Sequence, residues 1–107
     1  MGAFEEREEG FEKLYAHDEE VRFKALARRN KRVGLWAAGL MGLADEAANA
    51  FASRLVEAQV GRPDDESLVA ALKQAFAEAK VQMSNNRIRR QISEATAAAL
   101  DEIAAGR

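Results

Sequence analysis

The chain has 107 residues, a length that suits a single domain with one modest hydrophobic core. Hydrophobic residues make up 48% and charged residues 32%, which is the composition of a globular chain rather than a disordered one. There is no cysteine and one histidine, which excludes a disulfide scaffold, a thiolate zinc site and a His-rich metal site. The longest apolar stretch, residues 33–44, is shorter than the roughly 20 residues of a membrane span, and the acidic start does not resemble a signal peptide. We therefore expect a cytoplasmic protein without membrane insertion.

The residue composition predicts an all-α fold. Alanine occurs 23 times, proline once, and the β-branched residues Val, Ile and Thr together only ten times. Gly61 suits a left-handed helix end, whereas Asp64 and Ser84 suit the first position of a new helix. Together with the apolar periodicity, these signals predict four helices, over residues 19–41, 45–60, 65–80 and 85–104.

Each predicted helix carries an apolar stripe at helical spacing, and four stripes joined by short loops predict an antiparallel four-helix bundle. The residues expected to face the core are Phe23, Leu26, Ala27, Val33, Gly34, Ala37, Leu40 and Met41 in the first helix; Ala44, Ala47, Ala48, Phe51, Leu55 and Ala58 in the second; Leu68, Val69, Leu72, Ala75, Phe76 and Ala79 in the third; and Ile88, Ile92, Ala95, Ala99 and Ile103 in the fourth. The alanine-rich faces indicate that the helices approach one another closely.

Two residues of the first helix allow more than one interpretation. Asn30 lies within the apolar stripe, either as a buried amide satisfied by a neighbouring helix or as a polar contact that fixes the helix register. Trp36 lies on the other side of the same helix, and it is either a core residue or an exposed docking residue.

Residues 1–18 precede the first helix and differ from the rest of the chain. Phe4, Phe11 and Tyr15 form a narrow helical stripe, but so short a helix with Gly10 inside it is marginal in water. This combination is typical of a segment that folds in the groove of a partner. The alternatives are a frayed acidic tail and an N-terminal helix that packs back on the bundle.

Charge is segregated along the chain: residues 1–20 carry a net charge of −6 and residues 21–32 a net charge of +6. The basic run could neutralise phosphates, but the whole chain has a net charge of −2 and the bases do not line one face of the helix. We therefore expect no nucleic acid and predict that the run meets acidic surface, within this protein or on a partner. His17 is either a surface residue or a pH-sensitive contact. No constellation of catalytic or metal-binding residues appears, so the sequence predicts neither an enzyme nor a cofactor.

One block of sequence carries a resemblance to a known family. Its motifs are Phe11-Glu12, Ala16-His17-Asp18-Glu19-Glu20, Phe23-Lys24-Ala25, Ala27-Arg28-Arg29-Asn30-Lys31 and Gly34-Leu35-Trp36-Ala37-Ala38. In these motifs the chain resembles the zeta-subunit family, small inhibitor proteins of the bacterial F-type ATP synthase, also catalogued as a domain of unknown function. It departs from the family pattern at Tyr15, where Phe is frequent, and at Ala44, where Ser is frequent.

The resemblance implies a flexible N-terminal inhibitory segment, residues 1–18, followed by a four-helix bundle, residues 19–107. It implies that the segment enters the catalytic head of the synthase between the α, β and γ subunits, becomes helical there and blocks rotation in the direction of ATP hydrolysis. The inhibitory contacts would fall on Phe4, Arg7, Glu8, Phe11, Glu12, Tyr15, Ala16, His17 and Asp18. The family motif of the first helix comprises Phe23, Lys24, Arg28, Arg29, Asn30 and Trp36. The alternative function is that of a non-inhibitory helical adaptor.

Overall fold

The computed structural model describes residues 19–62 and 64–107, and these residues form four α-helices. The helices are α2 (Glu19–Leu40), α3 (Asp45–Ala58), α4 (Asp65–Glu78) and α5 (Asn85–Ala104). The predicted all-α fold is thereby confirmed, and the starts of all four helices agree with the sequence prediction. The ends of α3 and α4 come two residues earlier than predicted, because the chain turns away from each helix axis there.

Local hydrogen bonds account for the helix starts. The Asp64 side chain accepts a hydrogen bond from the backbone N–H of Ser67 at 2.8 Å, and the Ser84 hydroxyl accepts one from the N–H of Arg87 at 3.2 Å. Each satisfies one of the N–H groups that the first turn of a helix leaves unpaired. The residue before α3 is Ala44, which has no side-chain acceptor and makes no such bond. The two helix starts predicted at Asp64 and Ser84 are therefore confirmed.

The end of α4 depends on a residue in a strained conformation. Lys80 has φ of 61°, in the left-handed region that glycine normally occupies. The N–H of Lys80 donates to the carbonyl of Ala77 at 3.0 Å, and the N–H of Val81 donates to the carbonyl of Phe76 at 2.9 Å. This pair of bonds is the Schellman arrangement, which reverses the chain direction. The predicted continuation of the helix to residue 80 is therefore wrong.

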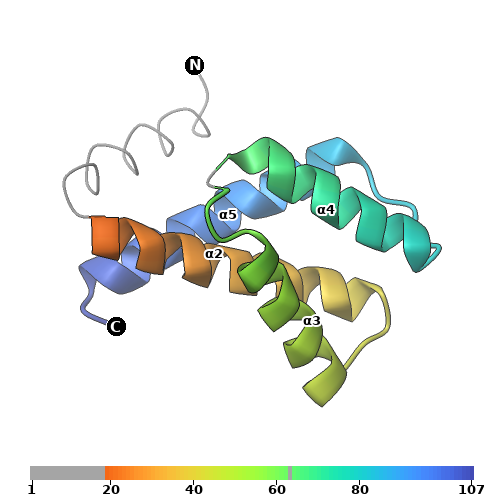
Figure 1. Cartoon of the computed structure of the whole chain (residues 1–107), viewed down its shortest axis with the longest axis horizontal. Helices are drawn as coiled ribbons and strands as arrows, with labels where there is room; N and C mark the ends of the chain where they lie inside the picture. Colours follow the sequence, from red (N-terminus) through yellow and green to blue (C-terminus); the bar gives the residue numbers. More distant parts are fainter. Residues whose placement is uncertain (1–18, 63) are drawn as a thin grey trace.

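The longest helix, α2, lies in the middle of the arrangement. It makes its main contacts with α3 on one side and with α5 on another, while α4 packs mainly against α5. Figure 1 shows α3 folding back from the end of α2, and α5 crossing α2 to end beside the first turns of α2. α2 is thus held by both α3 and α5.

The main core gathers side chains from all four helices. Its largest fully buried members are Phe76, Leu68, Leu72, Ile88, Ile92 and Val33. The Trp36 ring packs edge-on against Phe76 with the ring centroids 5.6 Å apart, so the core interpretation of Trp36 is confirmed. A smaller cluster surrounds the fully buried Ala25, where α2 meets the C-terminal part of α5.

The predicted core faces are partly wrong. Six residues that were expected to face the core are exposed: Phe23, Leu40, Ala44, Ala47, Ala58 and Ala79. Phe51, expected to be as deeply buried as Phe76, is only half-buried. In α2 the fully buried positions include Ala25 and Ala38, because this helix contacts two neighbours through small residues on different sides. Large apolar side chains such as Phe23 are consequently left outside the contacts.

Candidate partner-binding site

The residues predicted to contact a partner fall into two sets. The nine positions of the N-terminal segment lie outside the residues that the structure describes: Phe4, Arg7, Glu8, Phe11, Glu12, Tyr15, Ala16, His17 and Asp18. The six positions of the α2 motif are all described, and they do not form one site. Arg28, Arg29, Asn30 and Trp36 make contacts within the protein, whereas Phe23 and Lys24 are exposed.

Arg29 and Asn30 are buried, each with 5% of its surface exposed. The guanidinium of Arg29 donates to the Asn30 amide oxygen at 3.2 Å and to the Asp65 carboxylate at 2.8 Å. A buried charge is tolerated only when it is paired, so this contact joins α2 firmly to the first turn of α4. The prediction of a buried Asn30 amide is confirmed. The partner of its oxygen is Arg29 on the same helix, however, and not a residue of a neighbouring helix.

Arg28 and Arg32 pair with one carboxylate at the other end of the chain. Arg28 contacts Glu102 at 3.4 Å, Arg32 contacts the second oxygen of the same carboxylate, and Arg28 also donates to the backbone carbonyl of Arg107. The hydrogen bond from Arg32, with the positive charges of both arginines, holds the pKa of Glu102 below its usual value. These contacts join α2 to the last turns of α5. The prediction that the basic run meets acidic surface is confirmed within the protein.

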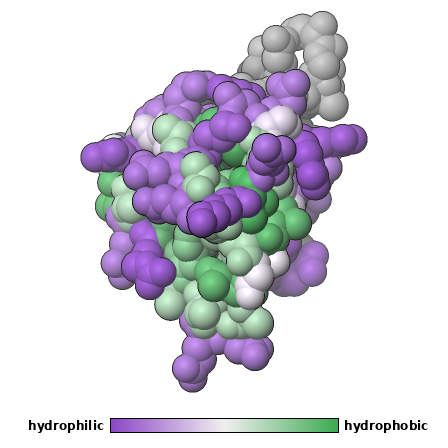
Figure 2. Space-filling model, turned by 90° about the vertical axis from the view of Figure 1, so that its right-hand side faces the viewer, coloured by the Kyte–Doolittle hydropathy of each residue, from purple (hydrophilic) through white to green (hydrophobic). Residues whose placement is uncertain are grey.

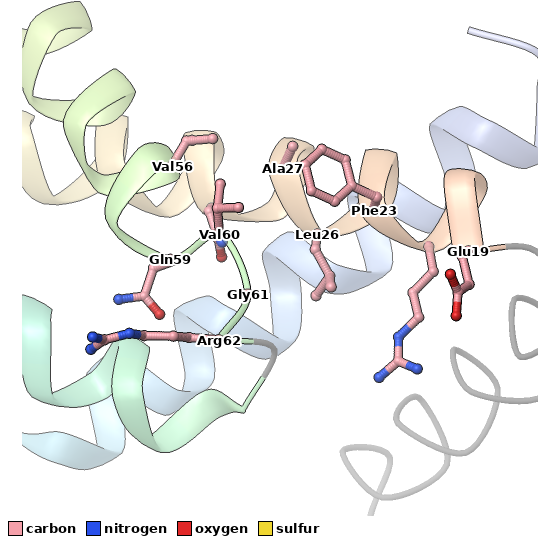
Figure 3. Close-up of a pocket in the computed structure, with 11 residues that line it drawn as sticks. Glu19, Phe23, Leu26, Ala27, Val56, Gln59, Val60, Gly61 and Arg62 are labelled. Carbon is pink, nitrogen blue, oxygen red and sulfur yellow. The ribbon is translucent and has the colours of Figure 1, made fainter.

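Beside this network lies a cleft between the N-terminal half of α2 and the end of α3 (Figure 3). Its volume is about 380 Å³. We define the α2–α3 cleft by Arg22, Phe23 and Leu26 of α2 together with Val56, Val60 and Arg62 at the end of α3 and the following turn. Phe23 is 59% exposed and Val60 is 56% exposed. The cleft therefore presents two large apolar side chains to solvent, and beside them two cations and the carboxylate of Glu19.

The lining of the cleft also includes a buried polar side chain, Gln59. Gln59 is only 7% exposed, and among the described residues its side-chain oxygen has no hydrogen-bond partner. Leaving such a group unsatisfied costs about 1–3 kcal/mol. In Figure 3, Phe23 of α2 and Val60 after α3 stand on either side of the cleft. An apolar surface with cations beside it suits an amphipathic peptide that carries carboxylates.

The opposite end of the molecule offers a second hollow, at the turn between α4 and α5. Phe76, Val81 and Met83 contribute to it, but Lys73 closes one side by donating to the Met83 carbonyl. Figure 2 shows this end of the molecule, where hydrophobic areas are crossed by hydrophilic side chains. The hollow has a volume of about 740 Å³ and follows the Schellman end of α4, and Lys73, Lys80 and Arg87 line it beside its apolar side chains.

Sequence reasoning missed the α2–α3 cleft because it assigned Phe23 to the core. A signal was present, since Phe23 stands between Arg22 and Lys24 in a run of charged residues, where a core aromatic is unusual. Val60, which follows α3, also has no place in the helical stripes. Neither signal identifies the two residues as neighbours, because that depends on how α3 folds back on α2.

Within residues 19–62 and 64–107, no group of His, Cys, Asp or Glu side chains is arranged to hold a metal ion. None of the four described helices is long and apolar enough to cross a membrane.

Comparison with known proteins identifies the family of the chain. No curated protein matches the chain. A sequence model of a protein family described as ATPase inhibitor subunit zeta matches residues 1–102, which is nearly the whole chain. The chain therefore belongs to the ATPase inhibitor subunit zeta family, a membership that implies a regulatory, non-enzymatic role in inhibiting the F-type ATP synthase.

Proposed function

We propose that this chain inhibits ATP hydrolysis by the bacterial F-type ATP synthase by inserting residues 1–18, as a helix, into the catalytic head. The observation that carries the proposal is that the family match begins at residue 1 and so includes the N-terminal segment as well as the four helices. The segment would enter between the α, β and γ subunits and oppose rotation in the hydrolysis direction. The protein would act at the cytoplasmic face of the membrane that holds the synthase.

The apolar anchors of the segment are Phe4, Phe11 and Tyr15, which share one face of a helix. Ordering the backbone of a flexible segment costs about 1–2 kcal/mol per residue, and each aromatic side chain that is buried recovers about 1.5–3 kcal/mol. The three anchors would therefore offset only part of the ordering cost, and further contacts of the segment with the head would supply the rest. The charged residues around them, including Arg7, Glu8, Glu12 and Asp18, lie beside the stripe and would set orientation and association rate.

The four helices supply a fixed base for the segment. Its last residue, Asp18, is followed directly by the first residue of α2. Contacts of Arg29 with α4 and of Arg28 and Arg32 with α5 restrain this helix on two sides. A helix that continues from a restrained base can move in fewer directions, which lowers the entropy lost when the segment inserts.

The test is a titration of the isolated cognate catalytic head with the full-length protein, with ATP hydrolysis as the readout. We expect the rate to fall as the inhibitor binds, and deletion of residues 2–18 to abolish the effect while the helix content by circular dichroism persists. A helical adaptor that works through the bundle would instead keep its binding to the head after the deletion. Full hydrolysis at saturating full-length protein would refute the proposal.

A further inference from the structure

We infer that the α2–α3 cleft is a second binding site for the catalytic head, one that takes an amphipathic helix with apolar side chains on one face and carboxylates beside them. The inference rests on the proposed function, and it adds a contact made by the folded helices to the contact made by residues 1–18. Three features of the cleft support it.

The first feature is the exposed apolar surface. Phe23 and Val60 are both more than half exposed, and the half-buried Leu26 and Val56 join them in one lining. Figure 3 shows the Phe23 ring on the side of α2 that faces the end of α3. Apolar area removed from water stabilises a complex by about 25 cal/mol per Å², so an apolar helix face in this cleft would gain affinity from all four side chains.

The second feature is the charge beside the cleft. Arg28, Arg29 and Arg32 of the same basic run are paired with carboxylates of this protein. Arg22 and Arg62, by contrast, have no ion pair with any residue of the described part of the chain. Glu19 also lines the cleft and the charge of Arg62 acts on Asp64, but the two arginines leave the lining with a net positive charge. A positive charge beside an apolar lining favours an occupant that bears acidic residues, and it would steer the approach of that occupant.

The third feature identifies the occupant as part of the catalytic head. The positions Phe4, Phe11, Tyr15, Arg22 and Leu26 follow one another at intervals of seven, four, seven and four residues. Intervals of seven and four keep side chains on one face of a helix. If residues 1–18 extend α2 as a helix on the head, their aromatic stripe continues into the cleft. The surface of the head that receives the stripe would then lie next to the cleft as well.

The test compares full-length variants by the concentration that halves ATP hydrolysis by the isolated head. Phe23→Ala removes the main apolar contact, and we expect this concentration to rise about fivefold or more, as for a residue of an interface centre. Leu40→Ala is the matched control, because Leu40 is a 41% exposed apolar residue at the other end of α2. The control should change the concentration by less than about twofold, since isolated surface side chains contribute little.

A charge reversal provides a second pair. Arg62→Glu should raise the half-inhibitory concentration, because the new carboxylate would face a carboxylate of the occupant and repel it. The effect should be stronger at low salt, where charges are less screened. Arg54→Glu, on an exposed part of α3 outside the cleft, should have little effect. Both arginines are exposed, so neither reversal removes a core contact, and thermal unfolding of each variant would show this.

The outcomes separate this inference from the proposed function. If the unmodified chain inhibits and the two cleft variants inhibit equally well, the cleft is not a contact and the proposed function stands. If the cleft variants inhibit more strongly, the cleft holds residues 1–18 in the free protein, which also overturns the inference. If the unmodified chain neither inhibits nor binds the head, the proposed function itself fails. Weaker inhibition by Phe23→Ala and Arg62→Glu, but not by their controls, supports the inference.

Discussion

A β-carbon added to Gly34 would lie 2.9 Å from the Cα atom of Ala52. Carbon atoms of two helices do not approach that closely, so α2 and α3 cross here with backbone against backbone, which only a residue without a side chain allows. Leu55 lies 3.3 Å from the same point and leaves little room for the added atom to shift. The close contact at Gly34 sets the angle at which α3 folds back on α2. This angle in turn places Phe23 and Val60 on either side of the α2–α3 cleft.

Gly34→Ala should therefore destabilise the protein, although alanine is the better helix former. The gain in helix propensity is about 1 kcal/mol, and the overpacked crossing costs about 1–3 kcal/mol, so we expect a net loss. Gly39→Ala is the control, because Gly39 also lies in α2 but has no atom within 4 Å of the added carbon. It should stabilise by up to about 1 kcal/mol. Urea unfolding of both variants measures the difference, and equal stabilities would contradict the close crossing.

The ion pair of Arg29 and Asp65 gives a second prediction. Asp65→Ala should destabilise by about 2–4 kcal/mol, because it takes the carboxylate away from a guanidinium that is buried. Glu66→Ala removes the neighbouring pair with Arg89, whose two side chains are far more exposed, and should cost less than about 1 kcal/mol. Chemical denaturation compares the two. A loss for Glu66→Ala as large as that for Asp65→Ala would show that burial does not determine the cost.

Stability should fall in acid, in part through Glu102. Its pKa is lowered in the folded state by the hydrogen bond from Arg32 and by the charges of Arg32 and Arg28. A lowered folded pKa means that the stabilisation is complete above the ordinary value of 4.5 and is lost as the pH falls through the folded pKa. Glu102→Gln should make the thermal midpoint less dependent on pH between neutral pH and pH values below 4.5. An unchanged pH profile would exclude this contribution.

Replacing Lys80 by glycine should stabilise the turn between α4 and α5. Lys80→Gly removes the penalty of a left-handed conformation, and we expect a gain of about 0.5–1 kcal/mol. Lys80→Ala serves as the control for loss of the side chain itself, and it should give no such gain because alanine retains the β-carbon that causes the strain. Thermal unfolding distinguishes the two, and a gain of equal size in both would assign it to the lysine side chain instead.

The features that the sequence predicts correctly depend on residues close together in the chain. Asp64 and Ser84 start helices because each bonds to an N–H three residues ahead, an interaction that needs no tertiary contact. The end of α4 was not predictable in the same way, since Lys80 adopts a conformation for which its residue type gives no signal.

The predicted features that failed depend on contacts between distant parts of the chain. The face of α2 was misjudged at Phe23 because two neighbouring helices contact α2 through small residues, which carry a weak hydrophobic signal. Arg29 contacts a residue 36 positions away and Arg28 one 74 positions away. Such pairings cannot be identified from charge pattern alone. The role predicted for residues 1–18 lies outside the described residues, so it remains a prediction.

The inhibitory role predicted for residues 1–18 depends first on an aromatic anchor, Phe11. Phe11→Ala should weaken inhibition of ATP hydrolysis at least about tenfold, because a central aromatic anchor typically contributes 2 kcal/mol or more to an interface. Glu5→Ala and Glu9→Ala are controls within the same segment and should change inhibition only a few-fold, since their charges lie beside the stripe. Equal losses for all three variants would show that the stripe does not carry the binding.

The most direct test of helix insertion is residual ATP hydrolysis by the isolated catalytic head, measured against the concentration of the Gly10→Pro variant. Proline within the segment removes a backbone hydrogen bond and breaks a continuous helix, while residues 19–107 keep their sequence. We predict that Gly10→Pro leaves hydrolysis at its uninhibited rate at concentrations where the unmodified chain stops it. Inhibition by Gly10→Pro equal to that of the unmodified chain would contradict insertion of the segment as a helix.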